Sequence, residues 1–155
     1  MNLIEEVNAL YPRANALGIV IRNKQILVEE QSGSHSKGTG TYYRPIGGTI
    51  ELGEYSQDTL VREFYEEIGV EIEVKQYLKC VVNIFSIDGN IGHEITQVYA
   101  VQFVDPNLYE VEQFQVTEQD KITITKWIPV SEFEHGKRVL YPNGLTELLT
   151  DDMFN

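Results

Sequence analysis

Residues 47–70, GGTIELGEYSQDTLVREFYEEIGV, are the most informative part of the chain, because a glycine-rich turn runs here into a short acidic helix. Ser56 suits the N-cap of that helix, and Asp58 lies in the first turn, where the helix dipole favours negative charge. Gly69 follows the last periodic residue and is typical of a C-terminal stop. These signals predict a helix of about three to four turns between Ser56 and Gly69.

This helix carries an acidic face beside an apolar stripe. At about 100° per residue, Glu63, Glu66 and Glu67 fall within one arc of roughly 100°. The neighbouring stripe comprises Leu60, Val61, Phe64 and Ile68. On a solvated helix such like-charged pairs cost only about 0.2 to 0.5 kcal/mol, so an ordinary wet surface is one interpretation. At a half-buried site, two charges about 6 Å apart repel by roughly 3 kcal/mol, which favours a bound divalent cation such as Mg²⁺.

The spacing of these residues resembles a known family signature. Gly48, five residues, Glu54, seven residues, and then REFYEEIGV up to Val70 fill every required position of the Nudix box. Agreement at so many fixed positions is far more specific than a lone glycine motif. The sequence is therefore identified as similar to the Nudix hydrolases. The resemblance implies an α+β Nudix fold, an α/β/α sandwich around a mixed β-sheet.

The same resemblance assigns roles to the motif residues around Mg²⁺ or Mn²⁺. The implied metal ligands are the carbonyl of Gly47 and the carboxylates of Glu63, Glu66 and Glu67. Glu63 is alternatively the catalytic base. Glu54 and Arg62 are implied to orient these carboxylates through charge-assisted hydrogen bonds. Related enzymes often draw a further acidic ligand or base from outside the helix, and the candidates here are Glu94, Glu112 and Glu118.

Two functions are consistent with this site. The first is a divalent-metal-dependent hydrolase that cleaves the pyrophosphate bond of a nucleoside diphosphate linked to another group, by attack of water on phosphorus. The second is a regulatory module that binds nucleotides and has kept the site without turnover. Some Nudix subfamilies carry a proline or tyrosine 15 to 18 residues after the motif, whereas residues 85–88 here are Phe-Ser-Ile-Asp. This disfavours the ADP-ribose and dinucleoside polyphosphate subfamilies.

The composition and charge of the chain limit the classes of molecule that it is expected to bind. The 155 residues suit one domain over 1–155, and the formal charge of −12 disfavours nucleic-acid polymers and anionic membranes. No apolar run reaches the roughly 18 residues of a membrane span, and the N-terminus lacks the basic start of a secretory signal. The single cysteine excludes an intrachain disulfide and suits the cytoplasm. We expect a small phosphorylated substrate, and a homodimer is left open.

The segments before the motif are expected to be strands and a loop. Residues 16–21 and 26–28 are β-branched runs that predict two strands joined by a tight turn. Residues 31–41, QSGSHSKGTGT, lack apolar anchors and are expected to form a mobile loop, a candidate lid. His35 and Lys37 in this loop are candidate phosphate contacts. Arg44 forms either a salt bridge at the rim or a phosphate contact.

The segments after the motif alternate between strands and helices. Residues 72–87 and 94–104 predict an antiparallel hairpin around Asp88-Gly89-Asn90. His93-Glu94 would then be a polar pair where the second strand begins. Residues 105–120 are expected to form a long loop beside the active face. The remaining expectations are a strand that buries Ile122, Ile124 and Ile128, a capping box at Ser131 and Glu134, and helices around Leu3 to Leu10 and Leu145 to Leu149.

Overall fold

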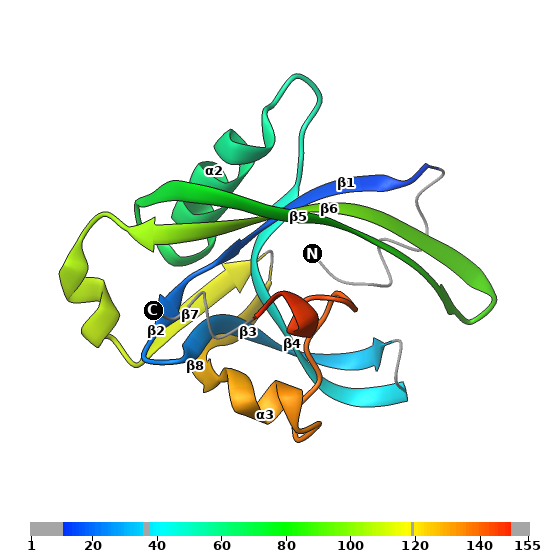
Figure 1. Ribbon diagram of the computed structural model, residues 1–155. Coiled ribbons are helices and arrows are strands. Elements are labelled where there is room, and N and C mark those ends of the chain that lie inside the picture. The colour runs from blue at the N-terminus through cyan, green and yellow to red at the C-terminus, as the bar shows by residue number, and fades with distance from the viewer. Residues whose placement is uncertain (1–10, 36–37, 119, 150–155) are drawn as a thin grey trace.

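The computed structural model describes residues 11–35, 38–118 and 120–149, so the expected N-terminal helix and Lys37 lie outside the described residues. An eight-stranded mixed sheet organises the chain (Figure 1). The strands are β1 (Arg13–Ile19), β2 (Ile21–Arg22), β3 (Gln25–His35), β4 (Gly38–Thr49), β5 (Ile72–Ile87), β6 (Asn90–Phe103), β7 (Gln113–Glu118) and β8 (Lys121–Pro129). The helical elements are α2 (Ser56–Ile68), η1 (Pro106–Glu110), α3 (Val130–Glu134) and η2 (Thr146–Leu148).

The strand order confirms the expected mixed sheet. It runs β5-β6-β1-β4-β3-β8-β7, with β2 paired to β3, and β1 lies parallel to β6 while the other pairs are antiparallel. Both expected hairpins form. Asn23 and Lys24 take positive φ values in the β2–β3 turn, and Asp88 and Gly89 do so in the β5–β6 turn. Such turns match the twist of the strands that they join.

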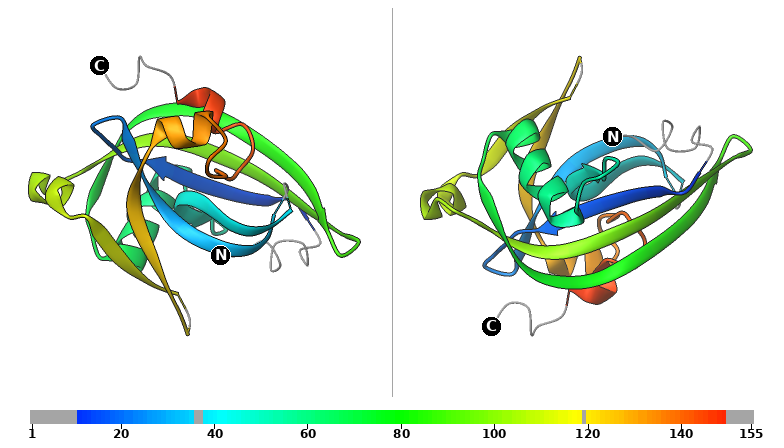
Figure 2. Two further views of the ribbon diagram at one scale, coloured as in Figure 1. Left: turned by 90° about the horizontal axis from the view of Figure 1, so that it is seen from below. Right: turned by 90° about the horizontal axis from the view of Figure 1, so that it is seen from above.

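Helices cover both faces of the sheet, as Figures 1 and 2 show. On one face α2 packs Leu60 and Phe64 into a core cluster with Leu27, Ile46 and Trp127 of the sheet. On the other face, residues of α3 and the segment around η2 pack against β1, β3 and β8. This arrangement agrees with the expected α/β/α layers. No helix among the described residues is long and apolar enough to cross a membrane.

Helix α2 begins one residue earlier than the capping signal suggested. Tyr55 is the N-cap, without a side-chain cap, and Ser56 is the first helical residue. The Ser56 hydroxyl instead contacts the Tyr99 hydroxyl at 2.6 Å. Gly69 ends the helix as expected, with a φ of 69° that favours glycine. Within the predicted apolar stripe, Val61 proves to be exposed because it lies on the solvent side of the helix.

The expected mobile loop over residues 31–41 is wrong. β3 and β4 continue through it as a hairpin with regular pairing from Gln31 and Tyr42 to His35 and Gly38. Gln31 and Tyr42 are both buried. Cross-strand hydrogen bonds satisfy the backbone here, so a segment without apolar side chains still forms extended structure. Nothing in this pairing supports a lid.

The chain after β6 also departs from its predicted structure. Residues 105–120 form the 3₁₀ helix η1 and strand β7 instead of one long loop. In β8, Ile122 and Ile124 are exposed, and Thr125 is fully buried. The expected burial of Ile122 and Ile124 is therefore wrong, whereas Ile128 is buried as expected. The opposite face of β8 carries Thr123, Thr125 and Trp127, so it meets polar groups as well as apolar core.

The C-terminal helical elements are short. α3 begins at Val130 with Pro129 as its N-cap, so Ser131 and Glu134 lie inside the helix and do not form the expected capping box. Near the C-terminus, the expected amphipathic helix is a 3₁₀ turn over Thr146–Leu148. Leu145 and Leu149 are nevertheless buried in the cluster beneath α3. The apolar pattern thus identified packing residues without identifying the element that carries them.

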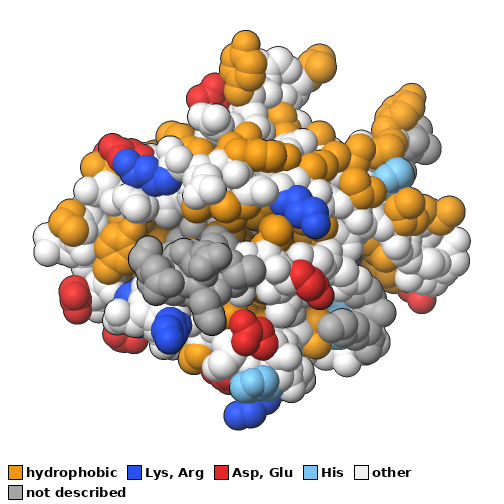
Figure 3. Space-filling view, in the orientation of Figure 1, with side chains coloured by type: hydrophobic (Ala, Val, Ile, Leu, Met, Phe, Trp, Pro, Cys, Tyr) orange, Lys and Arg blue, Asp and Glu red, His pale blue; other side chains and the backbone are white. Residues whose placement is uncertain are grey.

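The β5–β6 hairpin leaves apolar side chains exposed on the face seen in Figure 3. The exposed members include Tyr77, Val82, Ile84 and Ile91. Of four aromatic residues on this hairpin, Tyr99 and Phe103 are buried, Phe85 is partly buried and Tyr77 is half exposed. Tyr77 lies opposite the buried Tyr99 with the ring centres 5.2 Å apart, so this pair is only partly covered.

The packing of α2 predicts unequal losses of stability along one helix. Phe64 is fully buried and Val61 is 45% exposed. Phe64→Ala should lower the free energy of unfolding by about 3 to 5 kcal/mol, because it removes a ring from the core. Val61→Ala is the control and should change it by less than about 1 kcal/mol. Denaturant unfolding of both variants measures the difference. Equal losses would contradict the observed orientation of α2.

Candidate functional site

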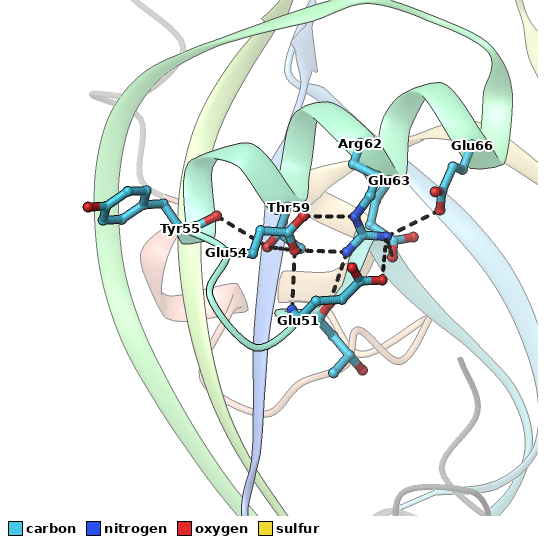
Figure 4. A network of polar contacts seen from close by, with 8 residues as sticks. Glu51, Glu54, Tyr55, Thr59, Arg62, Glu63 and Glu66 are labelled. Carbon is cyan, nitrogen blue, oxygen red and sulfur yellow. Dashed lines mark hydrogen bonds and ion pairs between the residues drawn. The ribbon is translucent and has the colours of Figure 1, made fainter.

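Arg62 of α2 connects the helix to the glycine-rich turn (Figure 4). Its Nε and Nη2 each donate to one oxygen of Glu54 at 2.9 Å, and Nη2 also donates to the carbonyl of Thr49 at 3.2 Å. Glu54 Oε1 further accepts from the Thr59 hydroxyl at 2.6 Å. The Arg62 guanidinium, followed by the Thr59 hydroxyl, lowers the pKa of Glu54 to about 2. Glu54 is thus an ionised anchor for Arg62 and not a proton carrier.

The third nitrogen of Arg62 reaches the acidic face of α2. Nη1 donates to Glu63 Oε1 at 2.9 Å and to Glu66 Oε2 at 3.2 Å. Glu66 is largely exposed, whereas Glu63 is mostly covered. A Cβ at Gly48 would lie 2.5 Å from the Glu63 carboxyl carbon, so a larger residue there would push this carboxylate aside. Backbone of β4 and the carboxylate of Glu63 are therefore in close contact.

Glu67 has the most unusual environment of the motif carboxylates. Its Oε2 is buried and has no hydrogen-bond partner in the described part of the chain. Burial raises the pKa of Glu67 well above its ordinary value, and the charges of Glu29, Glu63 and Glu118 raise it further. Burial also raises the pKa of Glu63, against the opposing effect of Arg62. Carboxylates from the helix and from the sheet therefore converge here.

Glu29 of β3 is a member of this cluster that sequence reasoning missed. It is 5% exposed and accepts a hydrogen bond of 2.6 Å from the Thr123 hydroxyl. It lies on the face of β3 that also carries Leu27 and Gln31. A signal was present in the sequence, because Glu29 directly follows the apolar run Ile26 to Val28. A charged residue that continues a buried strand requires a polar partner.

Glu94 belongs to a different buried network. It is fully buried within β6, which begins at Asn90, so the expected polar pair at a strand end is wrong. One oxygen accepts from Asn15 at 2.5 Å and from Arg44 Nη2 at 3.1 Å, and the other accepts from the Tyr141 hydroxyl. In the β1–β6 pairing Glu94 lies opposite Arg13 of β1. Its partners favour a structural role over that of an external base or metal ligand.

Arg44 is buried and not at the rim. It is 4% exposed, and its guanidinium lies 5.5 Å from the centre of the Tyr141 ring as well as against Glu94. Arg44 also pairs across the strands with Glu29, whose pKa it lowers against the larger opposing effect of burial. The salt bridge therefore exists, but it connects the Glu94 network to the edge of the carboxylate cluster.

The remaining candidate site residues differ in whether they lie near the motif carboxylates. Glu118, at the end of β7, lies close enough to raise the pKa values of Glu29 and Glu67 by its charge. Glu112 instead forms an exposed ion pair with Arg22 at 3.4 Å. His35 ends β3 with its ring 5.4 Å from that of Tyr42. Of the three acidic candidates outside the helix, Glu118 is the one beside the motif carboxylates.

The donor set suits a hard divalent cation. An unpaired buried oxygen of Glu67, the nearby carboxylate of Glu63 and the backbone of the glycine turn are oxygen ligands of the kind that Mg²⁺ and Mn²⁺ prefer. Among residues 11–35, 38–118 and 120–149, no three acidic, histidine or cysteine side chains are already arranged around a cation position. Arg62 engages Glu63 and Glu66 instead. Metal binding would therefore require these two side chains to exchange partners.

Comparisons with known proteins agree with this architecture. A NUDIX hydrolase from Nitrosomonas europaea is similar with a TM-score of 0.63 and 16% identity, covering 93% of this chain and 89% of that one. An ADP-ribose pyrophosphatase from Streptococcus suis gives a TM-score of 0.56 and 13% identity, covering 90% and 87%. Nudix hydrolase 6 of Arabidopsis thaliana is 26% identical over 113 residues. That match spans 72% of this chain but about a third, 36%, of the plant protein.

The family model for the NUDIX domain matches residues 12–148. That range contains all of the motif carboxylates, the glycine turn and the sheet that supports them. By this match over most of its length, the chain belongs to the NUDIX family.

Proposed function

We propose that the chain is a divalent-metal-dependent hydrolase that cleaves the pyrophosphate bond of a nucleoside diphosphate linked to another group. The observation that carries the proposal is the buried, unpaired oxygen of Glu67 beside Glu63 and the Gly48 backbone. Buried like charges are costly unless a cation is shared between them. A solvated acidic helix would have no reason to bury one of its carboxylates in this way.

The residues divide between holding a cation and positioning those that hold it. Glu63, Glu66, Glu67 and the carbonyl of Gly47 would hold Mg²⁺ or Mn²⁺, which supplies positive charge against the diphosphate when bound. Arg62, itself fixed by Glu54, orients Glu63 and Glu66. A carboxylate of this cluster, Glu63 or Glu118, orients or deprotonates the attacking water.

The substrate we propose is a small nucleotide derivative. A chain with a formal charge of −12 repels nucleic-acid backbones, whereas a compact diphosphate can be neutralised locally by a metal ion. The fold neighbour from Streptococcus suis carries a name of this chemical class, an ADP-ribose pyrophosphatase. The surface charge and the single cysteine are also compatible with a cytoplasmic enzyme.

The first test is removal of metal. Purified protein, incubated with a panel of nucleoside diphosphate derivatives, should release phosphate-containing products in Mg²⁺ or Mn²⁺. Activity should disappear in EDTA and return when the metal is restored, because the diphosphate charge is then neutralised again. Product analysis by ion-exchange chromatography measures the reaction. Hydrolysis that continues unchanged in chelator would exclude the proposed chemistry, whereas metal-dependent binding without turnover would favour the regulatory module.

A second test separates Glu67 from an ordinary surface glutamate. Glu67→Gln removes a crowded buried charge, so the metal-free variant should melt at the same temperature as the wild type or higher. The corresponding gain in the free energy of unfolding is at most about 3 kcal/mol. Mn²⁺ binds only the folded site, so it should raise the melting temperature of the wild type much more than that of the variant. Turnover should fall at least about a hundredfold.

Glu71→Gln is the control for this test, because Glu71 is exposed and lies just beyond α2. It should keep both the metal-induced shift and turnover. The assignment of Glu67 fails if Glu67→Gln behaves like this control. The proposed charge repulsion around Glu67 is contradicted if the metal-free variant is markedly less stable than the wild type.

A further inference from the structure

Glu29 lies on a polar row that crosses three strands of the sheet. Antiparallel pairing places it opposite Arg44 of β4 on one side and opposite Thr125 of β8 on the other. Residues that face each other across antiparallel strands point to the same side of the sheet. This side also carries Leu27, Ile46 and Trp127, which pack in the core cluster beneath α2. Glu29 is therefore on the face that α2 covers.

The side chain of Glu29 is fixed by a hydrogen bond from the neighbouring strand β8. The Thr123 hydroxyl donates to its Oε1 at 2.6 Å, and only 5% of Glu29 is exposed. Thr125 beside it is fully buried, and its hydroxyl has no hydrogen-bond partner in the part of the chain that the structure describes. An unsatisfied buried hydroxyl next to a fixed carboxylate indicates a place where a further polar ligand is accommodated.

Glu67 belongs to α2, the helix that covers this face of the sheet, and it interacts with the charge of Glu29. Its Oε2 is buried without a partner among the described residues, and the charge of Glu29 affects it more than that of Glu63 or Glu118. The helix and the sheet thus each contribute a carboxylate with little solvent contact, and the two interact through their charges. Since like charges repel strongly away from water, a cation between them is the simplest source of compensation.

We propose that Glu29 is an additional metal-site carboxylate, contributed by strand β3, fixed by Thr123 and shared with Glu67 of α2. The inference rests on the proposed function, because it assigns one more residue to the same divalent-metal site. It also replaces Glu94 and Glu112 as the acidic residue supplied from outside the motif helix. Glu94 is bound by Asn15, Arg44 and Tyr141, and Glu112 is paired with Arg22.

The competing explanation is that Glu29 only balances the charge of Arg44. The two residues are cross-strand neighbours, and Arg44 lowers the pKa of Glu29. However, Arg44 already donates to Glu94 at 3.1 Å. The two explanations predict different effects of removing Glu29 on the stability of the metal-free protein. Loss of a counter-charge for Arg44 destabilises the protein, whereas loss of a carboxylate that repels Glu67 does not.

The test is Mn²⁺ binding by the full chain in the absence of nucleotide, measured by isothermal titration calorimetry together with the metal-free melting temperature. Glu29→Gln should weaken Mn²⁺ binding at least about tenfold and leave the melting temperature unchanged or higher. Glu30→Gln is the matched control on the same strand. Glu30 points to the opposite face, where it contacts Tyr43 and Lys126, so its variant should bind Mn²⁺ like the wild type.

Two further variants make the outcome decisive. Thr123→Val removes the hydroxyl that fixes Glu29 and should weaken Mn²⁺ binding less than Glu29→Gln does. If Glu67→Gln loses Mn²⁺ and Glu29→Gln keeps it, the assignment of Glu29 is overturned while the proposed function stands. If the wild type and Glu67→Gln bind Mn²⁺ equally, the proposed metal site itself fails. A lower metal-free melting temperature with unchanged Mn²⁺ affinity would identify Glu29 as the counter-charge of Arg44.

Discussion

One guanidinium group holds the candidate site together. Arg62 binds Glu54 through two parallel hydrogen bonds and the Thr49 carbonyl through another, so the end of β4, the following loop and α2 form one unit. The same group contacts Glu63 and Glu66. Lysine has no fork of donors that could serve these partners simultaneously. Core packing of Leu60 and Phe64 places α2 on the sheet, and this polar contact fixes its acidic face relative to the glycine turn.

The motif and its helix were predictable because their determinants are local. Helix period, the glycine stop at Gly69 and the spacing of the glutamates all lie within one stretch of 24 residues, 47–70. Both tight hairpins were predictable for the same reason, since turn residues specify them. The NUDIX match over residues 12–148 agrees with the family resemblance that the motif alone carried.

What the sequence did not reveal depends on pairing between distant strands. The segment around Ser34 contains little apolar surface, yet β3 and β4 pair through it. Ile122 and Ile124 were assigned to the core by alternation, although β8 turns Thr123 toward Glu29. Glu29 itself was missed because its significance comes from Glu67, 38 positions away in the chain. Side-chain alternation gives two faces but does not say which neighbour each face will meet.

The face that β3 and β4 share determines how substitutions in the core affect the candidate site. Leu27 and Ile46 belong to the core beneath α2, while Glu29 and Gly48 lie two residues farther along the same face, beside the carboxylates. Two residues of extended chain span only about 7 Å. The hydrophobic packing and the proposed metal site are therefore neighbours on a single sheet surface. Substitutions that reshape the core under α2 will therefore displace acidic oxygens, so the stability of this chain and the geometry of its candidate site are coupled.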